Sequence, residues 1–89
     1  MQLNDLLRLA VERGASDLHL KVGSHPMLRI GGALVPAVEH ARLDRGNLEA
    51  MGAALMSPTQ RQVFAQAQEL DLAYSVDGLA RFRCNIFQQ

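Results

Sequence analysis

The sequence predicts one α+β domain in which helices cover one face of a largely antiparallel sheet, with the element order αβββααββ. Two observations carry this prediction. The apolar residues change from helical spacing to strict alternation and back along the chain, and helix-capping residues stand where helical stretches begin. A length of 89 residues, 48% hydrophobic and 20% charged, is typical of one globular domain with a single core. Residues 1–89 are therefore interpreted as one domain.

The first helix is expected to begin almost at Met1 and to end at Gly14. Glycine readily adopts the left-handed conformation that closes a helix, and Arg13 before it suits the negative end of the helix dipole. The apolar side chains recur at helical spacing and predict one buried stripe: Leu3, Leu6, Leu7, Ala10 and Val11.

Three short strands are predicted next. From Asp17 to Val22 apolar and polar residues alternate, which indicates a strand with one buried face. After a turn, Met27 to Ile30 forms a second strand, and a Gly-Gly pair connects it to a third at Ala33 to Val35. Pro36 cannot donate a backbone hydrogen bond, which indicates either an edge position for the third strand or the end of that strand.

Two helices follow, each with its own capping signal. Asp44 is the expected N-cap of a helix that runs to about Met56, with Leu43 and Leu48 as a hydrophobic staple. The stretch from Ser57 to Gln60 matches a capping box with proline at the first helical position, so a third helix should start there. Its side chains expected to point inward are Val63, Phe64 and Ala67.

The last third of the chain predicts a β-hairpin with strands from Leu70 to Val76 and from Ala80 to Ile86. A two-residue loop at Asp77-Gly78 would set the apolar face of one strand beside the charged face of the other. A three-residue loop at Asp77-Gly78-Leu79 sets the apolar residues of both strands on the same face of the hairpin. It pairs Tyr74 with Phe82, Leu72 with Cys84, and Asp71 and Ser75 with Asn85 and Arg81.

Charge and cysteine content exclude several function classes. Nine basic and nine acidic residues leave a formal charge of +0, so no overall field would draw the chain to nucleic acid, and no nucleic-acid partner is expected. The single cysteine, Cys84, cannot form an internal disulfide, and no signal-peptide or membrane-spanning stretch is present. A cytoplasmic location is expected.

Arg81 and Arg83 stand two residues apart on a strand, so both guanidinium groups should project from one face. Arg29 could join them if its strand is their neighbour, and such a cluster could grip a phosphate. The alternative is a solvated sheet face on which Arg83 and Asp71 pair across the hairpin. Spacing alone favours that alternative.

No metal site and no catalytic residue are predicted. His19, His25, His40 and Cys84 lack the paired spacing of zinc ligands, and Cys84 alternates with apolar residues, as a buried inert thiol does. No G-x-x-x-x-G-K-[ST] phosphate loop occurs in the sequence, so this chain by itself is not expected to be an enzyme.

Two longer motifs are specific enough to indicate a protein family. The stretches from Gly14 to Leu20 (GASDLHL) and from Ala80 to Phe87 (ARFRCNIF) resemble signatures of the PilT-type retraction ATPases of type IV pili. The segments from Leu70 to Ser75 and from Pro26 to Ile30 are also similar to that family, and all four occur in the family's order. The chain is therefore identified as resembling the amino-terminal domain of such a motor.

The resemblance implies a PAS-like fold, joined in a longer parent to a RecA-like ATPase domain that would bind ATP and Mg²⁺. That domain is expected to be missing from these 89 residues. The parent would be a homohexamer at the inner-membrane base of the pilus. There it would contact the pilus platform and drive twitching motility.

The resemblance also assigns residues. It implies that Arg81 and Arg83 reach nucleotide phosphates, and Arg29 as well on the basis of a shorter motif. This differs from the solvated sheet face that their spacing alone favours. It further implies a subunit or domain interface, and its expected residues are Asp17, His19, Asp71 and Asn85.

Two alternatives remain. One is a stand-alone PAS-like binding or adaptor module that holds a small molecule between sheet and helices, although only 4% of the residues are aromatic. The other is a purely structural domain whose arginine face contacts a neighbouring subunit and never nucleotide.

Overall fold

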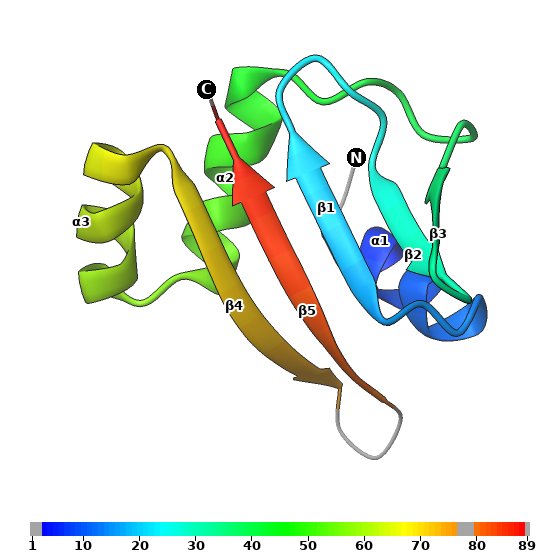
Figure 1. The fold of residues 1–89 in the computed structure, drawn as a ribbon. Helices are drawn as coiled ribbons and strands as arrows, with labels where there is room; N and C mark the ends of the chain where they lie inside the picture. Colours follow the sequence, from blue (N-terminus) through cyan, green and yellow to red (C-terminus); the bar gives the residue numbers. More distant parts are fainter. Residues whose placement is uncertain (1–2, 77–79, 89) are drawn as a thin grey trace.

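In a computed structural model, the backbone is described at residues 3–76 and 80–88 and the side chains at residues 3–73 and 83–88. The order of helices and strands is the predicted one (Figure 1). The elements are α1 (Leu3–Glu12), β1 (Asp17–Lys21), β2 (Met27–Ile30), β3 (Ala33–Pro36), α2 (Arg45–Leu55), α3 (Pro58–Ala67), β4 (Glu69–Val76) and β5 (Ala80–Phe87).

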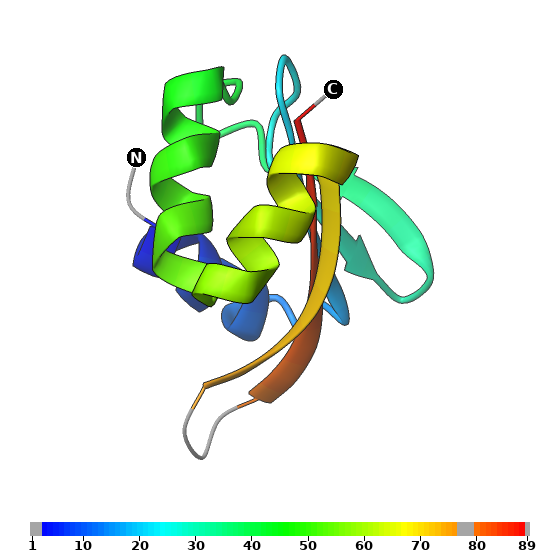
Figure 2. The same cartoon turned by 90° about the vertical axis from the view of Figure 1, so that its left-hand side faces the viewer.

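The five strands form one sheet in the order β3-β2-β1-β5-β4. Three of the pairings are antiparallel, and the central pair, β1 with β5, is parallel. All three helices lie on the same side of the sheet, so one face is covered and the other is open (Figure 2). The predicted α+β class is confirmed, and Pro36 ends an edge strand as its missing donor predicts.

Helix α1 ends in the way its glycine predicts. Gly14 has a φ of +65° and its N–H bonds the carbonyl of Val11, while Ala15 N–H bonds the carbonyl of Ala10 at 2.9 Å. This pair of bonds is the Schellman motif, which satisfies carbonyls that the helix itself leaves unpaired. It also turns the chain directly into β1.

Capping boxes begin both later helices. Asp44 accepts a hydrogen bond from the backbone of Asn47 at 2.7 Å, and the Asn47 side chain accepts one from the Asp44 backbone. Ser57 and Gln60 make the same reciprocal pair, with Pro58 at the first helical position. The predicted caps of both helices are confirmed, and an Ala replacement at such a cap typically costs about 1 kcal/mol.

The predicted register of the hairpin is confirmed. In the backbone register Tyr74 pairs with Phe82 and Leu72 with Cys84. Asp71 pairs with Asn85 on the other face. The predicted loop at residues 77–79 lies outside the described residues.

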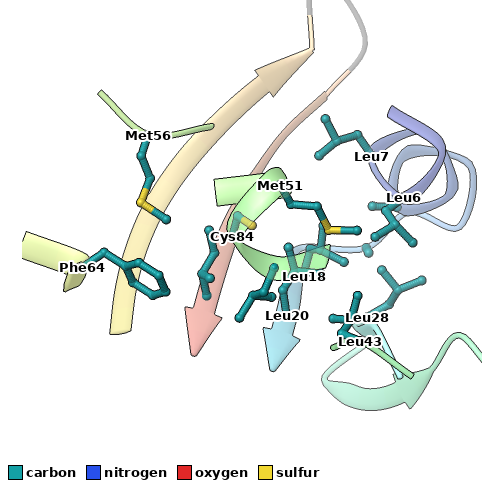
Figure 3. Packing of buried hydrophobic residues seen from close by; sticks show 14 residues of the cluster. Leu6, Leu7, Leu18, Leu20, Leu28, Leu43, Met51, Met56, Phe64 and Cys84 are labelled. Atoms are coloured by element: carbon teal, nitrogen blue, oxygen red, sulfur yellow. The ribbon is translucent and has the colours of Figure 1, made fainter. Parts of the chain in front are cut away.

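The core lies between the sheet and the helices (Figure 3). Leu18 and Leu20 of β1 and Cys84 of β5 have no exposed surface, and Met51 of α2 covers them from the helix side. Met51 is 3% exposed and belongs to the core. No helix in the described part of the chain is long and apolar enough to cross a membrane.

Part of the prediction for α3 is wrong. Phe64 is buried, but Val63 is 49% exposed and Ala67 is also exposed. The helix lies beside the edge strand β4, at the margin of the sheet, so only a narrow stripe of its surface meets the core (Figure 1). A helix there needs one anchoring side chain, and Phe64 is that anchor.

Two neighbouring substitutions test this arrangement. Phe64→Ala should lower the free energy of unfolding by about 3 kcal/mol, because it removes a large buried ring. Val63→Ala, the matched control, should change it by less than about 0.5 kcal/mol. Urea denaturation of both variants measures the difference, and equal losses would show that Val63 also belongs to the core.

Candidate functional site on the open sheet face

The open face carries polar side chains in cross-strand rows because strand residues alternate between the two faces. The first row contains Arg29 of β2, Asp17 of β1 and Arg83 of β5, side by side in register. We call these three residues the Arg-Asp-Arg row. It crosses the three middle strands of the sheet.

In the Arg-Asp-Arg row one carboxylate lies between two guanidinium groups. Arg83 Nε is 3.7 Å from Asp17 Oδ1, and Arg29 Nε is 3.8 Å from Asp17 Oδ2. The Asp17 side chain is only 15% exposed, against 40% for Arg29 and 72% for Arg83. The acid therefore lies at the floor of the row and the guanidinium groups reach outward over it.

Ser16, which the sequence analysis did not single out, ties the row together. Its hydroxyl donates to Asp17 Oδ2 at 2.6 Å. Its backbone N–H donates to the carbonyl of Arg29 at 2.9 Å, and its carbonyl accepts from the N–H of Arg83 at 3.0 Å. The sequence signal for this role is the Ser-Asp dipeptide at the start of a strand, because serine and aspartate side chains often form hydrogen bonds with nearby backbone groups.

Two details of the predicted arginine cluster need correction. Arg29 and Arg83 do not lie on neighbouring strands, because β1 runs between them and supplies Asp17. The hairpin pairing of Arg83 with Asp71 is also wrong, since Arg83 stands opposite Ala73 and makes its ion pair with Asp17. The side chain of Arg81 lies outside the described residues, although its backbone pairs with Ser75.

The second row of the open face holds the other predicted site residues. Asn85 donates through its amide nitrogen to Asp71 at 2.6 Å and to Glu69 at 3.4 Å. His19 stands between Met27 and Asn85 in register, and its Nε2 is buried with no partner in the described part of the chain. His19 thus makes no bond to Asp17, whose described partners are Ser16 and the two arginines.

The third row places Lys21 Nζ 5.4 Å from the ring centre of Phe87, a cation–π distance. The three rows make the open face largely polar on β1 and β5. Direct contacts join Asp17, Arg29 and Arg83 in the first row, and Asp71 and Asn85 in the second. His19 stands among them by register.

Other parts of the chain offer less chemistry. A pocket of about 320 Å³ lies between α2 and α3, with Met56 and Phe64 at its apolar wall and Arg61, Glu49 and Gln88 among its polar residues. Arg61 there donates to the carbonyl of Ala53. Among the described residues no group of His, Cys, Asp or Glu is arranged to hold a metal ion.

Cys84 is buried on the core face, as predicted. Burial, and secondarily the negative charge of Asp71, raises the pKa of its thiol from 9.0 to about 12. The thiolate is the reactive form of cysteine, so this thiol is chemically inert at neutral pH.

The geometry can be compared with known proteins. The chain is 37% identical over 93 residues to the type IV pilus retraction ATPase PilT of Pseudomonas aeruginosa. It is 34% identical over 89 residues to the type IV pilus ATPase PilU of the same organism. All of this chain is matched, but it spans only 26% and 23% of those two proteins. No protein-family model matches the chain.

The fold shows the same relationship. A crystal structure of the pilus retraction motor PilT with bound ADP superposes on 98% of this chain with a TM-score of 0.75 and 31% identity, and the chain covers 25% of that structure. Sequence and fold together define a domain of pilus motor ATPases. The chain is the counterpart of the amino-terminal domain of the type IV pilus retraction ATPases, as its motifs predicted.

The thiol of Cys84 gives a testable pH dependence. The unfolded chain loses the thiol proton near pH 9 and the folded chain keeps it until about pH 12, so the free energy of unfolding should fall as the pH rises through this window. Urea denaturation at pH 8 and pH 10 measures the fall. Cys84→Ala should show a shallower fall, and an identical slope in both proteins would contradict the raised pKa.

Proposed function

We propose that this domain works within an ATP-driven motor that retracts type IV pili, and that its open face supplies arginines to nucleotide bound by another domain. Arg83 and Arg29 are the proposed phosphate contacts, with Arg81 on the same strand as a third. The domain would pass the state of the nucleotide to the motor, so that hydrolysis is coupled to pilus disassembly and twitching motility. Catalysis itself would take place elsewhere.

The homology supports the motor. PilT is a retraction ATPase, and the solved PilT structure contains ADP. The present sequence has no phosphate loop of its own. The relatives are about four times as long as this chain, which leaves room for a RecA-like domain that holds ATP and Mg²⁺.

The single observation that carries the arginine role is the outward projection of the Arg-Asp-Arg row. Arg83 is 72% exposed, its ion pair with Asp17 is measured at Nε, and its side chain makes no hydrogen bond to a described residue, so its terminal nitrogens are open to a ligand. Those nitrogens form the planar fork that binds phosphate oxygens in pairs. A guanidinium that arrives from a neighbouring domain can neutralise charge that develops during phosphoryl transfer.

The same proposal places the domain in a homohexamer in which it meets the RecA-like domains of its own and neighbouring subunits. The motor would stand on the cytoplasmic side at the inner-membrane base of the pilus and contact the pilus platform. Asp71, Asn85 and His19 would belong to the domain or subunit contact, since they share the open face with the arginines.

A structural role for the row is the competing hypothesis, and charge reversal distinguishes the two. In the full-length protein that contains this domain, Arg83→Glu should lower kcat for ATP hydrolysis by about 10²-fold while the oligomer stays intact, because a phosphate contact is replaced by a repulsive charge. Steady-state turnover and sedimentation velocity measure the two properties. Arg83→Lys should recover only part of kcat, since lysine lacks the planar fork.

Arg13→Glu is the matched control, because Arg13 pairs with Glu39 at 2.7 Å, outside the Arg-Asp-Arg row. It should leave turnover within about twofold of the unmodified protein, as expected for an exposed pair. Loss of the oligomer in Arg83→Glu with normal turnover per assembled motor would refute the phosphate role and establish the structural one.

A further inference from the structure

The Arg-Asp-Arg row contains a negative charge at the place where a phosphate site needs positive charge. Arg29 and Arg83 contribute two positive charges and Asp17 one negative charge, so the row has a net charge of +1. The Asp17 side chain is only 15% exposed, and its Oδ2 accepts a hydrogen bond from the Ser16 hydroxyl at 2.6 Å, which favours its place between the arginines. Any phosphate that approaches these arginines therefore meets Asp17 as a competitor.

The contacts of Asp17 with the arginines are loose. Both distances, 3.7 and 3.8 Å, exceed those of a well-formed charged hydrogen bond, and both run through Nε, not through the terminal nitrogens. Arg29 uses one terminal nitrogen to donate to the carbonyl of Gly32 at 3.1 Å. Asp17 thus restrains the base of each guanidinium group and leaves most of its donors available.

The three backbones, in contrast, are held firmly. Asp17 pairs in register with Arg29 on one side and with Arg83 on the other, and Ser16 bonds the backbones of both arginines. The arginine Cα atoms therefore keep their spacing whether or not a ligand is bound. Only the long side chains are free to exchange one anion for another.

We propose that Asp17 is a built-in competitor for phosphate, which holds Arg29 and Arg83 in the row when no phosphate is present and releases them to phosphate oxygens that arrive from the solvent side. This inference rests on the proposed phosphate contact. Asp17 acts as a positioning residue that touches no nucleotide itself. An anion binds the arginines only if it attracts them more strongly than Asp17 does. A highly charged terminal phosphate is therefore favoured over a weakly charged anion.

The test measures phosphate binding directly. The side-chain Nε–H signals of Arg29 and Arg83 in a ¹⁵N-labelled sample of this chain are followed by NMR during titration with tripolyphosphate. Asp17→Asn removes the competing charge with almost no change of shape, and should tighten tripolyphosphate binding by about threefold to tenfold, the effect of one unit charge about 4 Å away when water screens it almost fully. The amide spectrum confirms that each variant is folded.

Two variants make the comparison sharp. Glu39→Gln removes the same charge from the exposed pair with Arg13, and should change the affinity by less than twofold because it lies outside the row. Asp17→Glu keeps the charge and should bind tripolyphosphate about as weakly as the unmodified chain. An Asp17→Glu variant that binds as tightly as Asp17→Asn would attribute the effect to shape and overturn the inference.

The outcomes separate this inference from the proposed function. Equal affinities in the unmodified chain, Asp17→Asn and Glu39→Gln, with the arginine signals responding to tripolyphosphate, would overturn the role of Asp17 and leave the phosphate contact in place. No response of the arginine signals in any variant would overturn the phosphate contact as well. Tighter binding in Asp17→Asn combined with normal ATP turnover in Arg83→Glu would support the competition and refute the nucleotide role.

Discussion

The parallel pairing of β1 with β5 is the constraint on which the rest of the structure depends. It joins Leu18 to Cys84 and Leu20 to Ile86 in register on the covered face, and all four of these side chains are fully buried. Because successive strand residues point to opposite faces, the same register sets Asp17 beside Arg83 on the open face. One pairing therefore determines both the centre of the core and the centre of the candidate site.

This coupling protects the geometry of the site. A slip of β1 by one residue against β5 would move Leu18 and Leu20 to the open face and Asp17 into the core. The cost of burying unpaired charges and exposing apolar area makes that alternative strongly unfavourable. The spacing of the arginines is thus maintained by hydrophobic burial on the other face of the sheet, and the weak ion pairs of the row do not have to maintain it.

Local features of the fold could be predicted from the sequence because each depends on neighbouring residues. The Schellman end at Gly14, the caps at Asp44 and Ser57 and the register of Tyr74 with Phe82 all depend on residues close in the chain. The position of Val63 could not be predicted, because apolar spacing shows which residues share a helix face but not how much of that face meets the sheet.

The candidate site was predictable only in part, for a related reason. The alternation around Arg83 shows that it leaves the core face, and the resemblance to the family motifs led to the hypothesis that the arginines contact phosphate. Strand order, however, depends on contacts between distant parts of the chain, so the sequence alone did not reveal that β1 inserts Asp17 between Arg29 and Arg83. The presence of an acid between two proposed phosphate ligands became visible only in the folded sheet.

The backbones of the row are fixed by strand pairing while the guanidinium groups are held loosely, and this combination suits the proposed phosphate contact, which would form and break as nucleotide binds and leaves. If the guanidinium groups were locked in close bidentate pairs with Asp17, a phosphate would have to break strong bonds before it gained its own. If they had no partner, each would lose the full rotamer entropy of a free arginine, about 2 kcal/mol, on binding. Contacts of 3.7 to 3.8 Å to one shared carboxylate lie between these limits, so the arginines are positioned in advance and can still be released.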